Sequence, residues 1–297
     1  MDSRNVGQAH DLLRSAKGLA ALAELADRGI RGPLQGSGDP IGDHHLTPTV
    51  AGDVNLDDRV RLLELSSHAV SDWLWNPEAR SAASTLTRTA SAYSDLADQV
   101  SASHGAAWWW EPIARQHQVL LADFGSIPGL SPDSLRAQSP RHHPGAGLFY
   151  GELLVTSRYV DAALPAALLL DVEITSGLLK PISCWSVAID DDARVLEIQN
   201  PSDWLNVCDA YPVAIPVPQH WTEWGVESHA AVTVDWDSVR ADWDAVHISM
   251  SAVLTATDIP LRAEDSVTML EGFCTDLTVW FSDVLSSPTH IGDWADT

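Results

Sequence analysis

A run of polar side chains follows a glycine-rich turn in the stretch G-A-G-L-F-Y-G-E-L-L-V-T-S-R-Y-V, residues 145–160. Thr156 and Ser157 offer hydroxyl groups, and Arg158 offers a guanidinium that can hold an anion. Tyr150 stands just before the third glycine of the stretch, Gly151, and supplies an aromatic face. The pattern predicts either a strand, a turn and a strand that bind a ligand, or a hairpin that only fills a core, because glycines also serve as plain turn residues.

Several patterns that define common enzyme and metal sites are missing from the sequence. It contains no G-x-S-x-G, no S-x-x-K and no G-x-x-x-x-G-K-[ST], and no third glycine follows 145–147 at Rossmann spacing. Histidines pair as direct neighbours, at His44–His45 beside Asp43 and at His142–His143. Adjacent side chains of an extended chain point apart, and zinc needs three or four convergent ligands. We therefore expect solvated loop histidines there.

Two other features each allow a functional and a structural interpretation. The run Trp108–Trp110 could stack against a base or a sugar, or it could plug a core between two subdomains. His247 follows a predicted helix on a predicted strand, where it could be catalytic or a hydrogen-bonded core histidine. We favour the structural interpretation of both features.

One resemblance suggests an enzyme. G-A-G-L-F-Y-G-E is similar to the G-K-G-I-Y-F-A-D pattern of the diphtheria-toxin-like branch of ADP-ribosyltransferases, and A-A-L-L-L-D-V-E-I at 166–174 looks like the strand that follows it there. In that family the first strand lines the NAD cleft. The resemblance implies NAD as cofactor, held by four side chains: Tyr150, Thr156, Arg158 and Tyr159.

The same resemblance implies where catalysis would take place. In the family, a carboxylate near the last strand bonds a ribose hydroxyl and stabilises the oxocarbenium-like state as nicotinamide leaves. The segment E-G-F-C-T-D-L-T-V-W-F offers Glu271 and Asp276 for this role, and Ser157 would join them in the pocket. The implied function is NAD-dependent transfer of ADP-ribose to an unknown target.

A second resemblance covers about a hundred residues. The blocks 185–212, 235–249 and 275–281 look like a family of uncharacterised actinobacterial and phage proteins, which brings no function with it. Physically these blocks are typical of scaffold. Trp236 and Trp243, seven residues apart, would share one helical face.

The charge is strongly asymmetric along the chain. Residues 1–150 carry 12 basic and 17 acidic side chains, whereas residues 151–297 carry 5 basic and 24 acidic ones, so most of the net charge of −24 lies in the second half. Nucleic acid and anionic membrane surfaces are disfavoured as its partners, because phosphate contacts need lysine and arginine. A small molecule or a basic protein is compatible with this charge as a partner. The alternative function is a non-enzymatic acidic interaction protein: an immunity protein, an antitoxin or a phage host-modulating factor.

Sequence signals favour a cytoplasmic protein. The start, M-D-S-R-N-V-G-Q-A-H, lacks a basic region followed by an apolar core, and no apolar run reaches the about 20 residues that span a bilayer. The three cysteines are far apart, without C-x-x-C spacing. We therefore expect reduced thiols rather than a disulfide framework.

Hydrophobic periodicity predicts an α+β fold in two parts. Residues 1–124 show apolar positions at helical spacing, and residues 125–146 are rich in glycine and proline and read as a linker. Residues 147–297 predict a mainly antiparallel, twisted sheet with short helices. The predicted helices are 8–29, 56–75, 77–100, a return to helix near Pro112, Pro201–Tyr211 and one from Asp235 or Asp237. The predicted strands are 147–150, 153–157, 166–174, 182–189, 193–198 and a final 277–281. Residues 213–218 fit an edge strand or an extended loop, and residues 245–255 alternate more like a strand than a helix, with helix as the alternative.

Overall fold

The structure is a computed structural model, in which two compact units, Met1–Trp109 and Trp110–Thr297, make up an α+β fold. The described residues are 3–27, 55–75, 86–122, 154–161, 164–169, 182–223, 226, 230–263, 265–271, 276–282, 284–286 and 288–294. The predicted linker, 125–146, lies outside these residues. No helix among these residues is long and apolar enough to span a membrane.

The first unit is helical, as its periodicity predicts. Its elements are α1 (Ser3–Arg14), α2 (Ala16–Asp27), α3 (Arg59–Trp75), the 3-10 helix η1 (Thr87–Tyr93), α5 (Ser94–Ala102) and the 3-10 helix η2 (Ala107–Trp110), which crosses the unit boundary. A single helix over 8–29 was a wrong prediction, because the chain breaks at Ser15, whose Oγ accepts from the Gly18 N–H at 3.2 Å. Leu12, Leu19 and Leu22 are buried in this unit's core.

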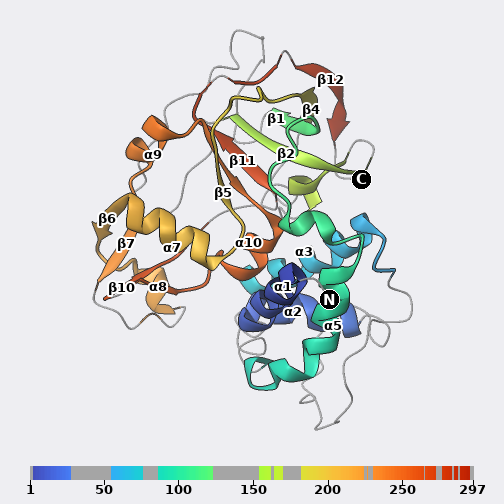
Figure 1. The fold of residues 1–297 in the computed structure, drawn as a ribbon, viewed down its shortest axis with the longest axis vertical. Helices are drawn as coiled ribbons and strands as arrows, with labels where there is room; N and C mark the ends of the chain where they lie inside the picture. Colours follow the sequence, from blue (N-terminus) through green and yellow to red (C-terminus); the bar gives the residue numbers. More distant parts are fainter. Residues whose placement is uncertain are drawn as a thin grey trace. The chain divides into compact units, whose positions relative to one another are not determined.

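The second unit is built on a large sheet (Figure 1). Its strands, in spatial order, are β12 (Thr289–Trp294), β4 (Ile182–Val187), β1 (Gln118–Ala122), β2 (Leu154–Asp161), β11 (Leu277–Trp280), β8 (Ala245–Ile248) and β5 (Val195–Ile198), and β3 (Leu164–Pro165) pairs with β2. All of these pairings are antiparallel except β5 with β8. The mainly antiparallel prediction is therefore confirmed for the described strands.

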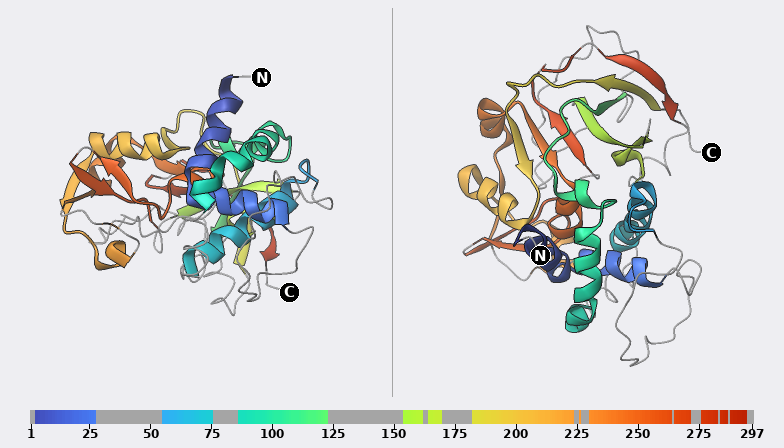
Figure 2. Two further views of the ribbon diagram at one scale, coloured as in Figure 1. Left: turned by 90° about the horizontal axis from the view of Figure 1, so that it is seen from below. Right: turned by 45° about the vertical axis from the view of Figure 1, so that its right-hand side comes forward.

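A smaller sheet lies beside α7 (Pro201–Ala210), at the other end of this unit from β12 (Figure 1, Figure 2). Its strand order is β6 (Pro212–Ile215), β7 (Ala231–Val234), β10 (Ser266–Thr268) and β9 (Leu261–Ala263). The proline-flanked β6 lies at the edge, as predicted. Helix α7 begins at its predicted cap, since the Asn200 side chain accepts from the N–H groups of Ser202 and Asp203.

Other elements of this unit show where local patterns mislead. Residues 118–122 form β1 rather than resumed helix, and Ala166–Leu169 is a 3-10 helix, η3, rather than a strand. The predicted strand over 245–255 is β8 followed by helix α10 (Met250–Thr255). Helix α9 (Trp236–Asp242) ends before Trp243, so the predicted shared face with Trp236 was wrong. The remaining described elements are α8 (Gln219–Glu223) and β12, which follows the strand predicted to be last.

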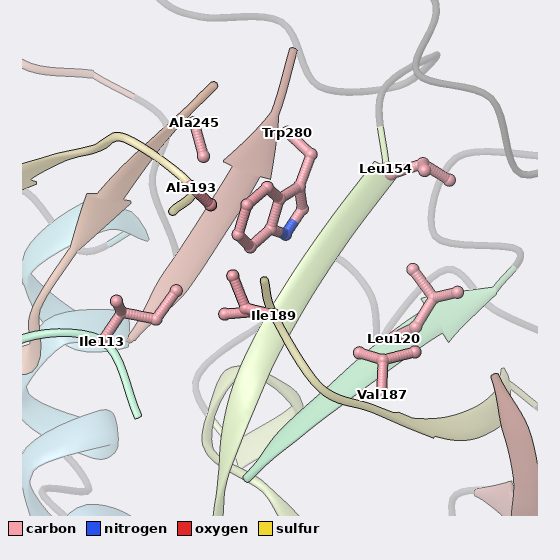
Figure 3. Close-up of a cluster of buried hydrophobic side chains, with 8 residues drawn as sticks. All are labelled: Ile113, Leu120, Leu154, Val187, Ile189, Ala193, Ala245 and Trp280. Carbon is pink, nitrogen blue, oxygen red and sulfur yellow. The ribbon is translucent and has the colours of Figure 1, made fainter. Parts of the chain in front are cut away.

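One apolar cluster covers one end of the large sheet on the face that carries Trp280 (Figure 3). Trp280 is fully buried at its centre, with Ile189 beside the indole. The members are Ile113, Leu120, Leu154, Val187, Ile189, Ala193, Ala245 and Trp280. Ile113 comes from the segment that leads into β1, so this segment packs on the sheet.

Candidate functional site

A row of polar side chains crosses the same face of the large sheet, next to the apolar cluster. Strand register places Thr278 of β11 opposite Thr156 of β2 and opposite His247 of β8, and His247 opposite Glu197 of β5. Because side chains alternate along a strand, Arg158 shares the face of Thr156. The row therefore brings a cation, a histidine and a carboxylate together.

Arg158 and Asp276 form the buried centre of the row. The Arg158 Nε lies 2.9 Å from Asp276 Oδ1, and the Arg158 backbone N–H donates to Oδ2 at 3.1 Å. The side chains are 6% and 0% exposed. Burial alone would raise the pKa of Asp276, but Arg158 and His247 hold that pKa below its usual value. Asp276 also has a φ of 49°, in the left-handed region that aspartate tolerates better than most residues.

His247 links this ion pair to Glu197. Its Nδ1 lies 2.5 Å from Glu197 Oε2, and its Nε2 lies 3.2 Å from Asp276 Oδ1. Burial alone would lower the pKa of His247, but the two carboxylates outweigh it and raise the pKa to about 9. At neutral pH the ring is therefore an imidazolium between two carboxylates. His247 is a hydrogen-bonded core histidine, as we favoured from the sequence.

The network is closed on itself. Arg158 Nη1 binds Glu111 and Nη2 binds the Pro112 carbonyl, while Glu197 Oε1 accepts from the Ile113 N–H. Each charged atom of Arg158, Asp276 and Glu197 named above thus has a protein partner. A fully satisfied network of this kind rigidifies the structure around it, and these atoms are already occupied by protein partners.

Thr156 and Ser157 face opposite sides of the sheet. Thr156 Oγ1 donates to Gln118 Oε1 at 2.8 Å and accepts from the Trp280 Nε1–H at 3.0 Å. Ser157 Oγ accepts from the Ala167 N–H at 2.9 Å. Both residues are fully buried. Ser157 is therefore not brought together with Asp276, although the next residue along β2, Arg158, contacts Asp276 directly.

The other predicted site residues lie apart from the row or outside the description. Tyr159 is half-buried, and its backbone N–H donates to the His117 carbonyl at 3.4 Å. Tyr150 lies outside the described residues, together with the first strand of the ADP-ribosyltransferase resemblance. So do the histidine pairs at 44–45 and 142–143.

Glu271 belongs to a different neighbourhood. Its Oε1 accepts from the Trp221 Nε1–H at 2.8 Å and lies 2.5 Å from Nε2 of the half-exposed His220. Burial raises the pKa of Glu271 despite the hydrogen bonds from His220 and Trp221. Trp221 belongs to the apolar cluster of the smaller sheet. The two predicted catalytic carboxylates, Glu271 and Asp276, therefore have separate sets of partners.

Metal and thiol chemistry find little support in the part of the chain that is described. No group of three or more potential ligands there could hold a metal ion. The described cysteines Cys184 and Cys208 are both buried, and burial raises the pKa of the Cys208 thiol to about 11. Of the tryptophan run, Trp108 and Trp109 are almost fully buried, which fits a packing role better than an open stacking platform.

Sequence reasoning did not find Glu111 and Glu197 as members of the network. One local signal was available for Glu197. In the strand V-L-E-I, a single carboxylate stands among apolar residues, which favours a polar partner on its face of the sheet. Its partner, His247, is fifty residues away, and only the β5–β8 register pairs them.

No protein-family model, no curated protein and no solved structure matches this chain. The two resemblances read from the sequence therefore stay predictions.

Proposed function

We propose that this protein is a non-enzymatic acidic interaction protein whose α+β unit binds a basic protein partner. The observation that carries the proposal is that three arginines of this unit each lie beside a carboxylate of the same unit, one pair buried and two at the surface. Arg158 is buried against Asp276, Arg194 lies 3.5 Å from Asp244, and Arg240 lies 3.7 Å from Asp237. Each of these three cations already has a carboxylate of the same unit beside it. Residues 151–297 contain 24 acidic side chains and only 5 basic ones, so a large excess of negative charge is left.

Exposed carboxylates supply the attraction. Asp190, Asp191 and Asp192 form a consecutive exposed run between β4 and β5, and Asp209 and Asp242 are exposed near α7 and α9. A surface with this charge draws in a cationic partner and speeds its association, and salt weakens both effects. The closed network around Arg158 supports the same proposal, because its polar atoms are already bound to protein groups.

The experiment is affinity capture from host lysate in a salt series, followed by calorimetry with the purified basic protein so obtained. We expect saturable binding that weakens at least tenfold between about 0.05 M and about 0.3 M NaCl. The double variant Asp191→Asn/Asp192→Asn should bind more weakly. The matched control, Asp57→Asn/Asp95→Asn, removes two exposed charges from the helical unit and should bind like the wild type. Binding that ignores salt and the first variant would refute the proposal.

ADP-ribosyl transfer is a second proposal, which rests on the resemblance at 145–174. Among the implied site residues, Arg158 and Asp276 are in direct contact. Calorimetry with NAD and an assay of nicotinamide release in the presence of host extract test it directly. NAD binding that Arg158→Lys and Tyr159→Phe both weaken would support it. The absence of both NAD binding and nicotinamide release would end it.

A further inference from the structure

The chain enters the α+β unit through a segment without regular secondary structure, residues 111–114. Side chains satisfy its backbone in place of a strand partner. The Ile113 N–H donates to Glu197 Oε1 at 3.0 Å, and the Pro112 carbonyl accepts from Arg158 Nη2 at 2.8 Å. Ile113 itself is buried in the apolar cluster. Because an unpaired buried backbone group is costly, these contacts fix the path of the segment.

We infer that Arg158 and Glu197 together form a clamp that holds this segment, and that Glu197 releases the Ile113 N–H when His247 loses its proton. The charged groups facing His247 are Glu197 from β5 and Asp276 from the residue before β11. Behind Asp276 stands Arg158 from β2, which also holds Glu111 of the segment at 3.0 Å.

His247 needs its second ring proton because it has to donate two hydrogen bonds, one to each neighbouring carboxylate. An ionised carboxylate only accepts hydrogen bonds, and each ring nitrogen of His247 faces one. Both nitrogens must therefore donate, which only the imidazolium can do. A neutral ring donates from one nitrogen, so the other would meet a carboxylate lone pair to lone pair. One of the two carboxylates must then find another environment.

Glu197 is the carboxylate that can leave. Its side chain is 26% exposed, whereas that of Asp276 is fully buried. Asp276 also keeps Arg158 and the Arg158 backbone N–H as donors when His247 is neutral. When Glu197 turns toward water it gives up the Ile113 N–H. The Arg158 contacts to Glu111 and the Pro112 carbonyl stay in place.

The direction of the pH effect follows from the raised pKa. A group whose folded pKa lies above its unfolded value adds stability that is complete below the unfolded pKa. For His247 these values are about 9 and 6.5, so its contribution is complete below about pH 6.5 and is lost as the pH rises through about 9. The clamp is thus closed at neutral pH and opens on the alkaline side.

The test follows the Ile113 amide by hydrogen exchange in the full-length protein from about pH 7 to about pH 10, with the His247 ring titration recorded by NMR. Protection of Ile113, corrected for the intrinsic exchange rate, should fall about tenfold or more along the His247 titration. The reference is the Ala167 amide, bonded to Ser157 on the opposite face. It should keep its protection.

Glu197→Gln is the decisive variant. A glutamine can still accept from the Ile113 N–H with its oxygen, and its NH2 group can donate to a neutral His247. We expect the His247 pKa to fall and Ile113 protection to become independent of pH over this range. The inference is overturned if wild-type Ile113 keeps its protection through the His247 titration, if Ala167 loses protection in parallel, or if the variant opens as the wild type does.

Discussion

Asp276 is the residue on which the buried charges converge, since both Arg158 and His247 contact its Oδ1. Removing one partner of a buried ion pair leaves the remaining charge without compensation. This differs from a surface pair, where water compensates the remaining partner. We therefore expect the contribution of a charge to the stability of this protein to depend on its burial more than on its ion-pair distance.

The variant Asp276→Asn tests how much a buried charge contributes to stability. Asparagine keeps the shape and tolerates the left-handed backbone of this position, but it leaves Arg158 and His247 buried with less counter-charge. We expect the free energy of unfolding, measured by urea denaturation at neutral pH, to fall by about 3–5 kcal/mol.

The matched control is Asp237→Asn, which removes an aspartate whose side chain is 70% exposed and lies 3.7 Å from Arg240. Its loss should cost less than about 1 kcal/mol. Similar losses in the two variants would show that burial does not set the energy of these pairs.

The sequence singles out Arg158 and Asp276 separately, through a polar run and a resemblance, but it does not pair them. They are 118 residues apart and meet only through the β2–β11 ladder. Glu197 and His247 meet through the parallel β5–β8 pair in the same way. Side-chain types could be read from the sequence. The register that joins them depends on long-range strand pairing, and no local pattern encodes it.

At the scale of elements, prediction succeeded where the signal is local. The Asn200 cap and Pro201 fix the start of α7, and Asp235 caps α9 in the same way. Prediction failed where a short apolar run fits two structures. Q-V-L-L-A at 118–122 fits a helix as well as a strand, and pairing with β2 and β4 makes it the strand β1.

The turn between α1 and α2 depends on a close backbone approach. A Cβ at Gly18 would lie 2.4 Å from the Leu12 carbonyl oxygen, whereas a Cβ at Gly7, within α1, would meet nothing within 4 Å. Gly18→Ala should lower the thermal unfolding midpoint, because the backbone of the turn has to shift. Gly7→Ala should raise it slightly, since alanine favours a helix by about 0.5–1 kcal/mol over glycine.

Circular dichroism melts of both variants measure the contrast, and each serves as the control for the other. A Gly18→Ala variant as stable as Gly7→Ala would mean that α1 and α2 are not held together by this approach.

At the scale of the molecule, hydrophobic periodicity predicted the α+β class, and the residue count gives the excess of negative charge. The compact units divide between Trp109 and Trp110, while residues 125–146, which read as a linker, lie outside the described residues. Residues 111–122 belong to the second unit because Ile113 packs in the apolar cluster on the large sheet and Gln118–Ala122 forms β1 within that sheet. A composition change marks where the local pattern changes, and long-range packing decides to which unit a segment belongs.

The net charge of −24 predicts how the whole protein responds to salt. Like charges repel more strongly in the compact state than in the expanded unfolded chain. Salt shortens the screening length from about 30 Å at 0.01 M to about 8 Å at 0.15 M, and buried pairs such as Arg158–Asp276 are screened much less. We therefore expect the thermal unfolding midpoint to rise by several degrees between about 0.01 M and about 0.3 M NaCl.

The triple variant Asp190→Asn/Asp191→Asn/Asp192→Asn separates charge repulsion from other effects of salt. It removes three neighbouring exposed charges between β4 and β5 without touching the buried network. Its unfolding midpoint should exceed that of the wild type at low salt, and the two should converge as salt is added, because screening removes the repulsion that the substitutions relieve. A midpoint that falls with salt, or equal slopes for the two proteins, would mean that repulsion among surface carboxylates does not limit the stability of this fold.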